Sequence, residues 1–188
     1  METMKRKRAE HVVRLKDRIG PHDAWGTEFG AEVFGRLNLE LLPLGEGSLV
    51  VIDFAGVERS DVSFQREAVV ETLRKHRPKV LFVAAQLTDQ DLRENLSIAL
   101  ERRGELLLVR ESKGAPSILG KKLAPDHQAT LDQVSRAGEL ASSDLTDKAT
   151  QLSTASSRLS WLWKAGLIER VEGTSSSGGR EHRYFAID

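Results

Sequence analysis

The chain has 188 residues, 39% hydrophobic and 30% charged, a balance typical of a soluble globular protein rather than a disordered one. Its 28 basic and 28 acidic residues cancel, so only local charge can point to a nucleic-acid partner. The sequence holds no cysteine, which excludes disulfides, thiolate metal sites and cysteine nucleophiles. No apolar run approaches the roughly 20 residues that span a bilayer. We therefore expect a cytoplasmic protein with no membrane partner, no metal and no other cofactor.

Residues 1–20 form a basic, polar segment that opens with four consecutive basic residues at 5–8. The segment lacks the apolar core of a signal peptide. Val12, Val13, Leu15 and Ile19 give it a weak apolar stripe, which predicts a helix. A break at residues 20–23 separates it from the rest of the chain.

Residues 27–122 alternate between helical and strand patterns. The predicted elements are, in chain order, a helix at 27–42, a strand at 49–54, a helix at 63–76, a strand at 80–84, a helix at 89–103, a strand at 106–109 and a short strand at 117–119. The strands are compact apolar runs, and the helices carry apolar residues every three or four positions. This alternation predicts an α/β domain with at least partly parallel strands.

The stretch Val-Val-Ile-Asp-Phe-Ala-Gly-Val-Glu-Arg-Ser-Asp-Val-Ser-Phe at 50–64 resembles the STAS and STAS-like domains, which include bacterial anti-sigma-factor antagonists. The matching positions are Asp53, Phe54, Val57, Asp61 and Ser63, and the resemblance spans about 27–110. In the antagonists a partner kinase phosphorylates the serine at the helix start, a role that would fall on Ser63. The glycine that usually follows that serine is a phenylalanine in this chain. From the residues alone, an ordinary helix cap is the favoured role of Ser63.

Residues 125–188 follow a different pattern. The predicted elements are a helix at 126–137, a second helix from Ser142 or Ser143 to Ala149, a turn at 151–153, a third helix at 154–166, and strands at 167–171 and 180–187 around a tip at 172–179. This is the order of a winged helix-turn-helix, and residues 141–170 resemble the bacterial regulators of the MarR and ArsR kind. The predicted boundary between the two domains lies at 122–126.

The third helix of this domain has two chemically different sides. Ala155, Leu159 and Leu162 share one face and must be buried. The opposite side and the wing carry hydroxyl, aromatic and basic residues that suit phosphates and base edges. The predicted DNA-binding residues are Thr154, Ser156, Ser157, Arg158, Trp161, Lys164, Arg180 and Arg183. We expect Trp163 at the margin of the core and Trp161 to be largely exposed as a contact surface.

Together these patterns predict a transcriptional regulator that binds double-stranded DNA as a homodimer. The STAS-like domain would then serve as a platform for sensing, dimerisation or a regulatory protein. The alternative is a partner-switching adaptor, related to the anti-sigma-factor antagonists, whose main contacts are proteins. An enzyme is not expected, because Asp53 and Asp61 have no nucleophile, metal ligand or phosphate loop near them in the sequence. We interpret these two aspartates as cap and turn residues.

Overall fold

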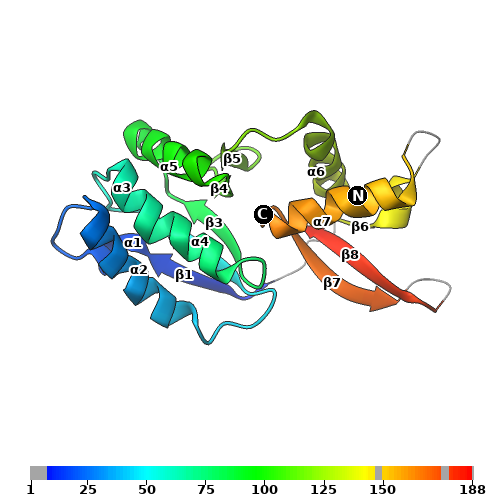
Figure 1. The fold of residues 1–188 in the computed structure, drawn as a ribbon, viewed down its shortest axis with the longest axis horizontal. Helices are drawn as coiled ribbons and strands as arrows, with labels where there is room; N and C mark the ends of the chain where they lie inside the picture. The colour runs from blue at the N-terminus through cyan, green and yellow to red at the C-terminus, as the bar shows by residue number, and fades with distance from the viewer. Residues whose placement is uncertain (1–7, 147–149, 175–177, 188) are drawn as a thin grey trace. The chain divides into compact units, whose positions relative to one another are not determined.

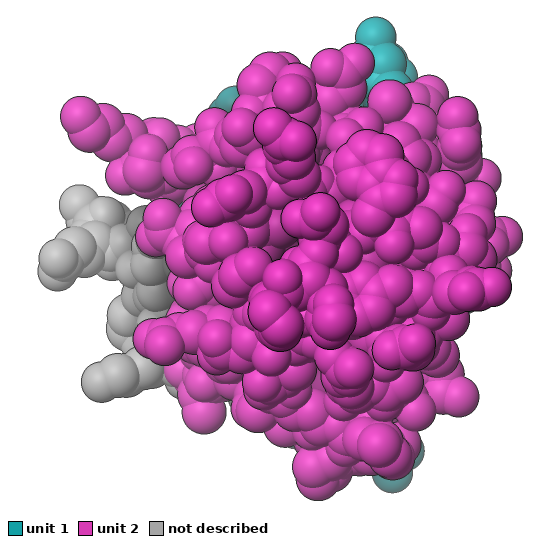
Figure 2. All heavy atoms as spheres, turned by 90° about the vertical axis from the view of Figure 1, so that its left-hand side faces the viewer, with its two compact units in different colours: residues 1–7, 122–188 teal, residues 8–121 magenta. Residues whose placement is uncertain are grey.

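The computed structural model describes residues 8–146, 150–174 and 178–187. The chain divides into two compact units, which Figure 2 distinguishes by colour. We call Arg8–Lys121 the sheet unit and the part from Lys122 onward the carboxy-terminal unit. Along the described residues, no helix combines the length and the apolar character needed to cross a lipid bilayer.

The sheet unit is a mixed α/β structure (Figure 1). Its elements are β1 (Glu10–Arg14), α1 (Leu15–Ile19), α2 (Thr27–Leu41), β2 (Leu49–Asp53), α3 (Val62–Gln65), the π-helical turn η1 (Arg66–Val70), α4 (Glu71–His76), β3 (Leu81–Ala85), α5 (Gln90–Arg103), β4 (Leu106–Arg110) and β5 (Ser117–Gly120). The predicted alternation of helices and strands between residues 27 and 120 is confirmed. The α/β class follows from it directly.

The predicted helix in the first 20 residues is wrong for its central part. Residues 10–14 form β1, which pairs in parallel with β2 and places Val12 beside Val51. Val13 is buried at 1% exposure whereas Val12 is 51% exposed, so the side chains alternate with the two-residue period of a strand. Only Leu15–Ile19 is helical. Two adjacent β-branched residues favour the strand that the neighbouring β2 can pair with.

The five-stranded sheet has the order β1-β2-β3-β4-β5, so strands that follow one another in the chain are neighbours in space. The first four strands are parallel, and β5 is antiparallel to β4. Parallel crossover connections are almost always right-handed, and in this sheet each crossover places the next strand in the same direction along the sheet. All the helices therefore pack against one face, where the core contains Ile52, Phe82 and Val109.

The opposite face of the sheet is also apolar and buried. Its residues alternate with those under the helices, and they are Leu49, Val51, Leu81, Val83, Leu106 and Leu108. Strands with apolar side chains on both faces are typical of parallel sheets. On this face Arg110 donates two hydrogen bonds to Glu10, of 2.8 and 3.2 Å, which tie β4 to β1 across the two strands between them.

The helical stretch Val62–His76 contains two features that bear on stability. Gln65 is completely buried, and neither its amide nitrogen nor its amide oxygen has a hydrogen-bond partner among the described residues. Gly30 of α2 faces the same stretch at very short range. A Cβ atom at Gly30 would lie 2.9 Å from the Cβ of Glu67 and 3.0 Å from the carbonyl oxygen of Phe64. The two backbones therefore approach each other in a way that only glycine permits.

The carboxy-terminal unit contains α6 (Pro125–Ala137), β6 (Glu139–Ala141), the 3₁₀ turn η2 (Ser142–Leu145), α7 (Leu152–Lys164), β7 (Ile168–Thr174) and β8 (Arg180–Ala186). Its sheet has the order β6-β8-β7 and is antiparallel. The predicted first helix, third helix and hairpin are present, although α7 begins two residues earlier than expected. The strand β6 was not predicted, and it pairs Leu140 with Tyr184.

The predicted second helix is shorter than expected in the described residues. Only Ser142–Leu145 is helical, as a 3₁₀ turn, and Thr146 lies beyond it. The Asp144 carboxylate accepts a 2.7 Å hydrogen bond from the backbone N–H of Ala141 and so fixes the start of the turn. The rest of that prediction falls on residues 147–149, which lie outside the described residues.

Candidate nucleic-acid interface

The helix α7 separates its side chains as its sequence predicts. Ala155, Leu159 and Leu162 are buried at 0–1% exposure and hold the helix to its unit. Thr154, Ser157 and Lys164 are exposed, and Ser156 is half-buried. The exposed side therefore offers two hydroxyls near the amino-terminal end of α7 and an ammonium group at its carboxy-terminal end.

Arg158 is held by a residue of the neighbouring helix. Its Nε lies 3.2 Å from Oδ2 of Asp126, the second residue of α6, although the contact lacks the geometry of a hydrogen bond. Desolvation raises the pKa of Asp126, but the backbone N–H of His127 and the charges of His127 and Arg158 outweigh it, so this pKa lies below its ordinary value. At neutral pH the carboxylate is ionised, and the guanidinium is already partly neutralised.

Trp161 is less exposed than expected. It does lie on the outward side of α7, but the ring of His127 covers it, with a centroid distance of 4.2 Å and an angle of 31° between the rings. Its side chain is therefore only partly exposed. Trp163 lies at the margin of the core, as predicted, and the Arg170 guanidinium carbon is 3.4 Å from its ring centroid.

An open groove of about 450 Å³ runs between the amino-terminal ends of α6 and α7. Three hydroxyl groups line it, those of Ser153, Thr154 and Ser157. Asp126 and Arg158 line it as well, which places a carboxylate and its cation among the residues predicted to contact DNA. A phosphate oxygen has the charge and the acceptor geometry to replace this carboxylate beside Arg158.

The two predicted wing cations differ in their surroundings. Arg183 of β8 forms ion pairs with Glu139 of β6 and, at 3.7 Å, with Glu181 of its own strand. Arg180, the first residue of β8, is exposed and forms no ion pair with any described residue. Among the described residues, Arg180 is therefore the less constrained of these two cations. The tip of the wing at 175–177 lies outside the described residues.

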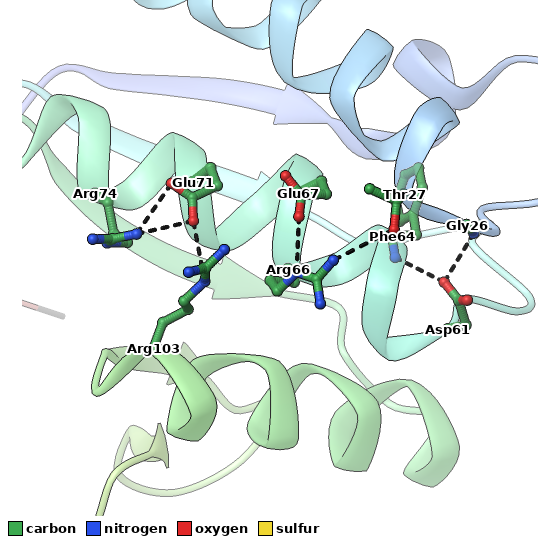
Figure 3. A network of polar contacts seen from close by, with 9 residues as sticks. All are labelled: Gly26, Thr27, Asp61, Phe64, Arg66, Glu67, Glu71, Arg74 and Arg103. Atoms are coloured by element: carbon green, nitrogen blue, oxygen red, sulfur yellow. Dashed lines mark hydrogen bonds and ion pairs between the residues drawn. The ribbon is translucent and has the colours of Figure 1, made fainter.

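In the sheet unit, the predicted cap role of Ser63 is wrong. Asp61 is the N-cap of α3, and its Oδ1 accepts hydrogen bonds from the backbone N–H groups of Phe64 (2.7 Å) and Gly26 (3.1 Å), as Figure 3 shows. Ser63 is the second residue of the helix and is half-buried. An aspartate two residues earlier satisfies the helix start first, because its carboxylate is the stronger acceptor. The interpretation of Asp53 and Asp61 as cap and turn residues is confirmed, since Asp61 caps α3 and the Oδ1 of Asp53 accepts a 2.9 Å hydrogen bond from the N–H of Ala55.

Asp126 and His127 are the residues of this interface that the sequence patterns missed. An acidic residue in the first turn of a helix is ordinary, because it complements the helix dipole. Only the packing of α6 against α7 brings both side chains to Arg158 and Trp161. No periodicity within either helix carries that information.

Comparisons of the chain with protein-family models, with curated proteins and with solved structures found no match.

Proposed function

We propose that the protein is a DNA-binding transcriptional regulator whose carboxy-terminal unit acts as a winged helix-turn-helix. The observation that carries this proposal is the exposed polar side of α7, where Thr154 and Ser157 border an open groove. The order α6, β6, η2, α7 and the β7–β8 hairpin supports the proposal, with the 3₁₀ turn η2 in the position of the second helix. In such domains the third helix enters the major groove and the hairpin contacts the backbone.

The roles of the residues follow from their exposure and pairing. Thr154 and Ser157 would donate hydrogen bonds to base edges or phosphates near the start of the helix. Arg158 would exchange the Asp126 carboxylate for a phosphate or a guanine. Lys164 and Arg180 are exposed and would contact phosphates at the two ends of the footprint.

The sheet unit would serve as a STAS-like platform that dimerises, senses a signal or binds a regulatory protein. A second copy would supply the second half-site that small two-fold regulators use to gain affinity and spacing. The second candidate function, a protein-interaction adaptor, is favoured by one observation in this unit, the 61% exposed side chain of Trp25.

Selection from a pool of random duplexes, followed by gel shift, tests DNA binding by the full chain. Arg158→Ala should weaken binding to the selected duplex by about 1–3 kcal/mol if the guanidinium contacts a base bidentately. Arg136→Ala, an exposed arginine near the carboxy-terminal end of α6, is the matched control and should leave binding nearly unchanged. Failure to select any duplex, or equal losses in the two variants, would contradict the proposal.

The salt dependence of the same binding reaction tests the wing. Arg180→Ala should reduce the slope of log affinity against log salt by about one, because one phosphate contact is lost. An unchanged slope would remove Arg180 from the interface.

A further inference from the structure

Trp25 is the most exposed large aromatic side chain in the described part of the chain, at 61%. It lies in the connection between α1 and α2. An indole ring can bury roughly 150–250 Å² in a contact, and tryptophan is among the residues that most often carry the binding energy of protein interfaces. An exposed indole is therefore a strong anchor for a partner wherever the residues around it form a site.

The backbone on both sides of Trp25 is fixed to the rest of the sheet unit. Ala24 is buried, pairs with Ser60 as an isolated bridge, and its carbonyl oxygen accepts a 3.2 Å hydrogen bond from the N–H of Asp61. Gly26 donates its N–H to the Asp61 carboxylate, 3.1 Å away (Figure 3). The indole is thus presented from a rigid turn, which lowers the entropy that a partner must overcome on binding.

A cavity of about 410 Å³ opens beside the indole and has aromatic walls. Phe29 lines it and is anchored to the core by Phe64, whose ring centroid is 5.7 Å away and which is completely buried. The ring of His22 meets Phe29 edge-on at 5.4 Å. The walls are therefore preformed.

The rim of this cavity is acidic. Asp23 and Glu32 line it. Asp23 forms no ion pair with any residue that the structure describes. Among those residues Glu32 forms an ion pair only with Arg36, at 3.7 Å, and the two side chains are 64% and 49% exposed. Aromatic faces beside exposed carboxylates are the chemistry that binds a guanidinium, which stacks on the rings and donates to the oxygens.

We propose that this cavity, lined by Trp25, Phe29, Asp23 and Glu32, binds an arginine side chain in a basic segment of a partner protein. A guanidinium suits this lining better than an ammonium, because a planar cation can stack on an aromatic ring and donate paired hydrogen bonds to a carboxylate at the same time. The site does not depend on DNA binding by the carboxy-terminal unit, so either function can fail without the other.

The test is a titration of the full-length protein with an acetylated, amidated Gly-Arg-Gly-Arg-Gly peptide, followed through the indole N–H signals in NMR spectra. Substitution of each tryptophan by phenylalanine in turn assigns the signals. The Trp25 signal should shift and saturate at peptide concentrations of roughly 1 mM or less, whereas those of Trp161 and Trp163 should not move. A peptide with glutamate in place of arginine should cause no shift, and one with lysine should bind several-fold more weakly.

Two carboxylate variants give the matched comparison. Asp23→Asn should weaken arginine-peptide binding several-fold. Glu28→Gln removes another exposed carboxylate, in the first turn of α2, that does not line the cavity, and it should leave binding unchanged. The proposal is overturned if the Trp25 signal does not respond, if the glutamate peptide shifts it equally, or if both carboxylate variants lose the same affinity.

Discussion

Replacing Gln65 by methionine should stabilise the sheet unit. The Gln65 side chain is completely buried, and its amide has no hydrogen-bond partner in the part of the chain that the structure describes, so folding removes the amide from water without compensation. Such a group costs about 1–3 kcal/mol. Methionine has an unbranched side chain of the same length and leaves no cavity, so most of that free energy should be regained.

The expected gain corresponds to a rise of about 4–12 °C in the melting temperature for a domain of roughly 100 residues. Urea denaturation followed by circular dichroism should show a higher midpoint with an unchanged slope for the sheet-unit transition. Gln90→Met is the control, because Gln90 is exposed and the same change there should alter the free energy of unfolding by less than about 0.5 kcal/mol. A Gln65→Met protein no more stable than the original would refute the reasoning and show that the amide is paired in solution.

Three further predictions concern other contacts. Asp126→Asn should tighten DNA binding several-fold at low salt, because Arg158 loses its carboxylate partner and a negative charge leaves the interface. Fluorescence anisotropy measures this affinity. Weaker binding would show that Asp126 does not compete with DNA for Arg158. Gly30→Ala should destabilise the sheet unit by about 1–3 kcal/mol, because the added methyl group overpacks the contact with the Val62–His76 stretch. Gly35→Ala is the control in the same helix, because a Cβ atom there meets open space. Equal losses of stability in thermal melts of the two variants would argue against the close contact at Gly30. The hydrogen bond from Arg18 is the main cause that holds the pKa of Glu40 below 4.5, so the stability it provides is present above that pH and lost as the pH falls below it. Glu40→Gln should thus be less stable than the original at pH 7 and nearly equal to it in strongly acidic solution, as denaturation at both pH values can establish.

Patterns within one segment predicted the fold well where the apolar signal is strong. Helix α2 has a clear apolar repeat, and the strands β2, β3 and β4 are continuous apolar runs. Strand β1 has the same length as those strands, but only two of its five residues are apolar, and these adjacent valines fit a short helical stripe as well as a strand. Strand β6 has three residues and exists because β8 pairs with it, which no local pattern can reveal.

The candidate interface shows the same limit at the level of single side chains. The helical wheel of α7 predicted correctly which residues are buried and which lie outward. It could not predict that α6 would place Asp126 against Arg158 and His127 against Trp161, because those contacts depend on the packing of two helices. The capping residue of α3 could not be predicted for a different reason. Asp61 and Ser63 are both good capping residues, and only the structure shows that Asp61 caps the helix.

The order of the strands has a consequence for how the protein is made. Because the sheet is assembled strictly in chain order, each strand that leaves the ribosome finds its neighbour already synthesised. Neighbouring parallel strands are about 25–39 residues apart along the chain, so no pairing has to wait for a distant part of the sequence. Nascent chains can therefore complete the sheet unit before the carboxy-terminal unit emerges, so that the last part of the protein folds after the first is already in place.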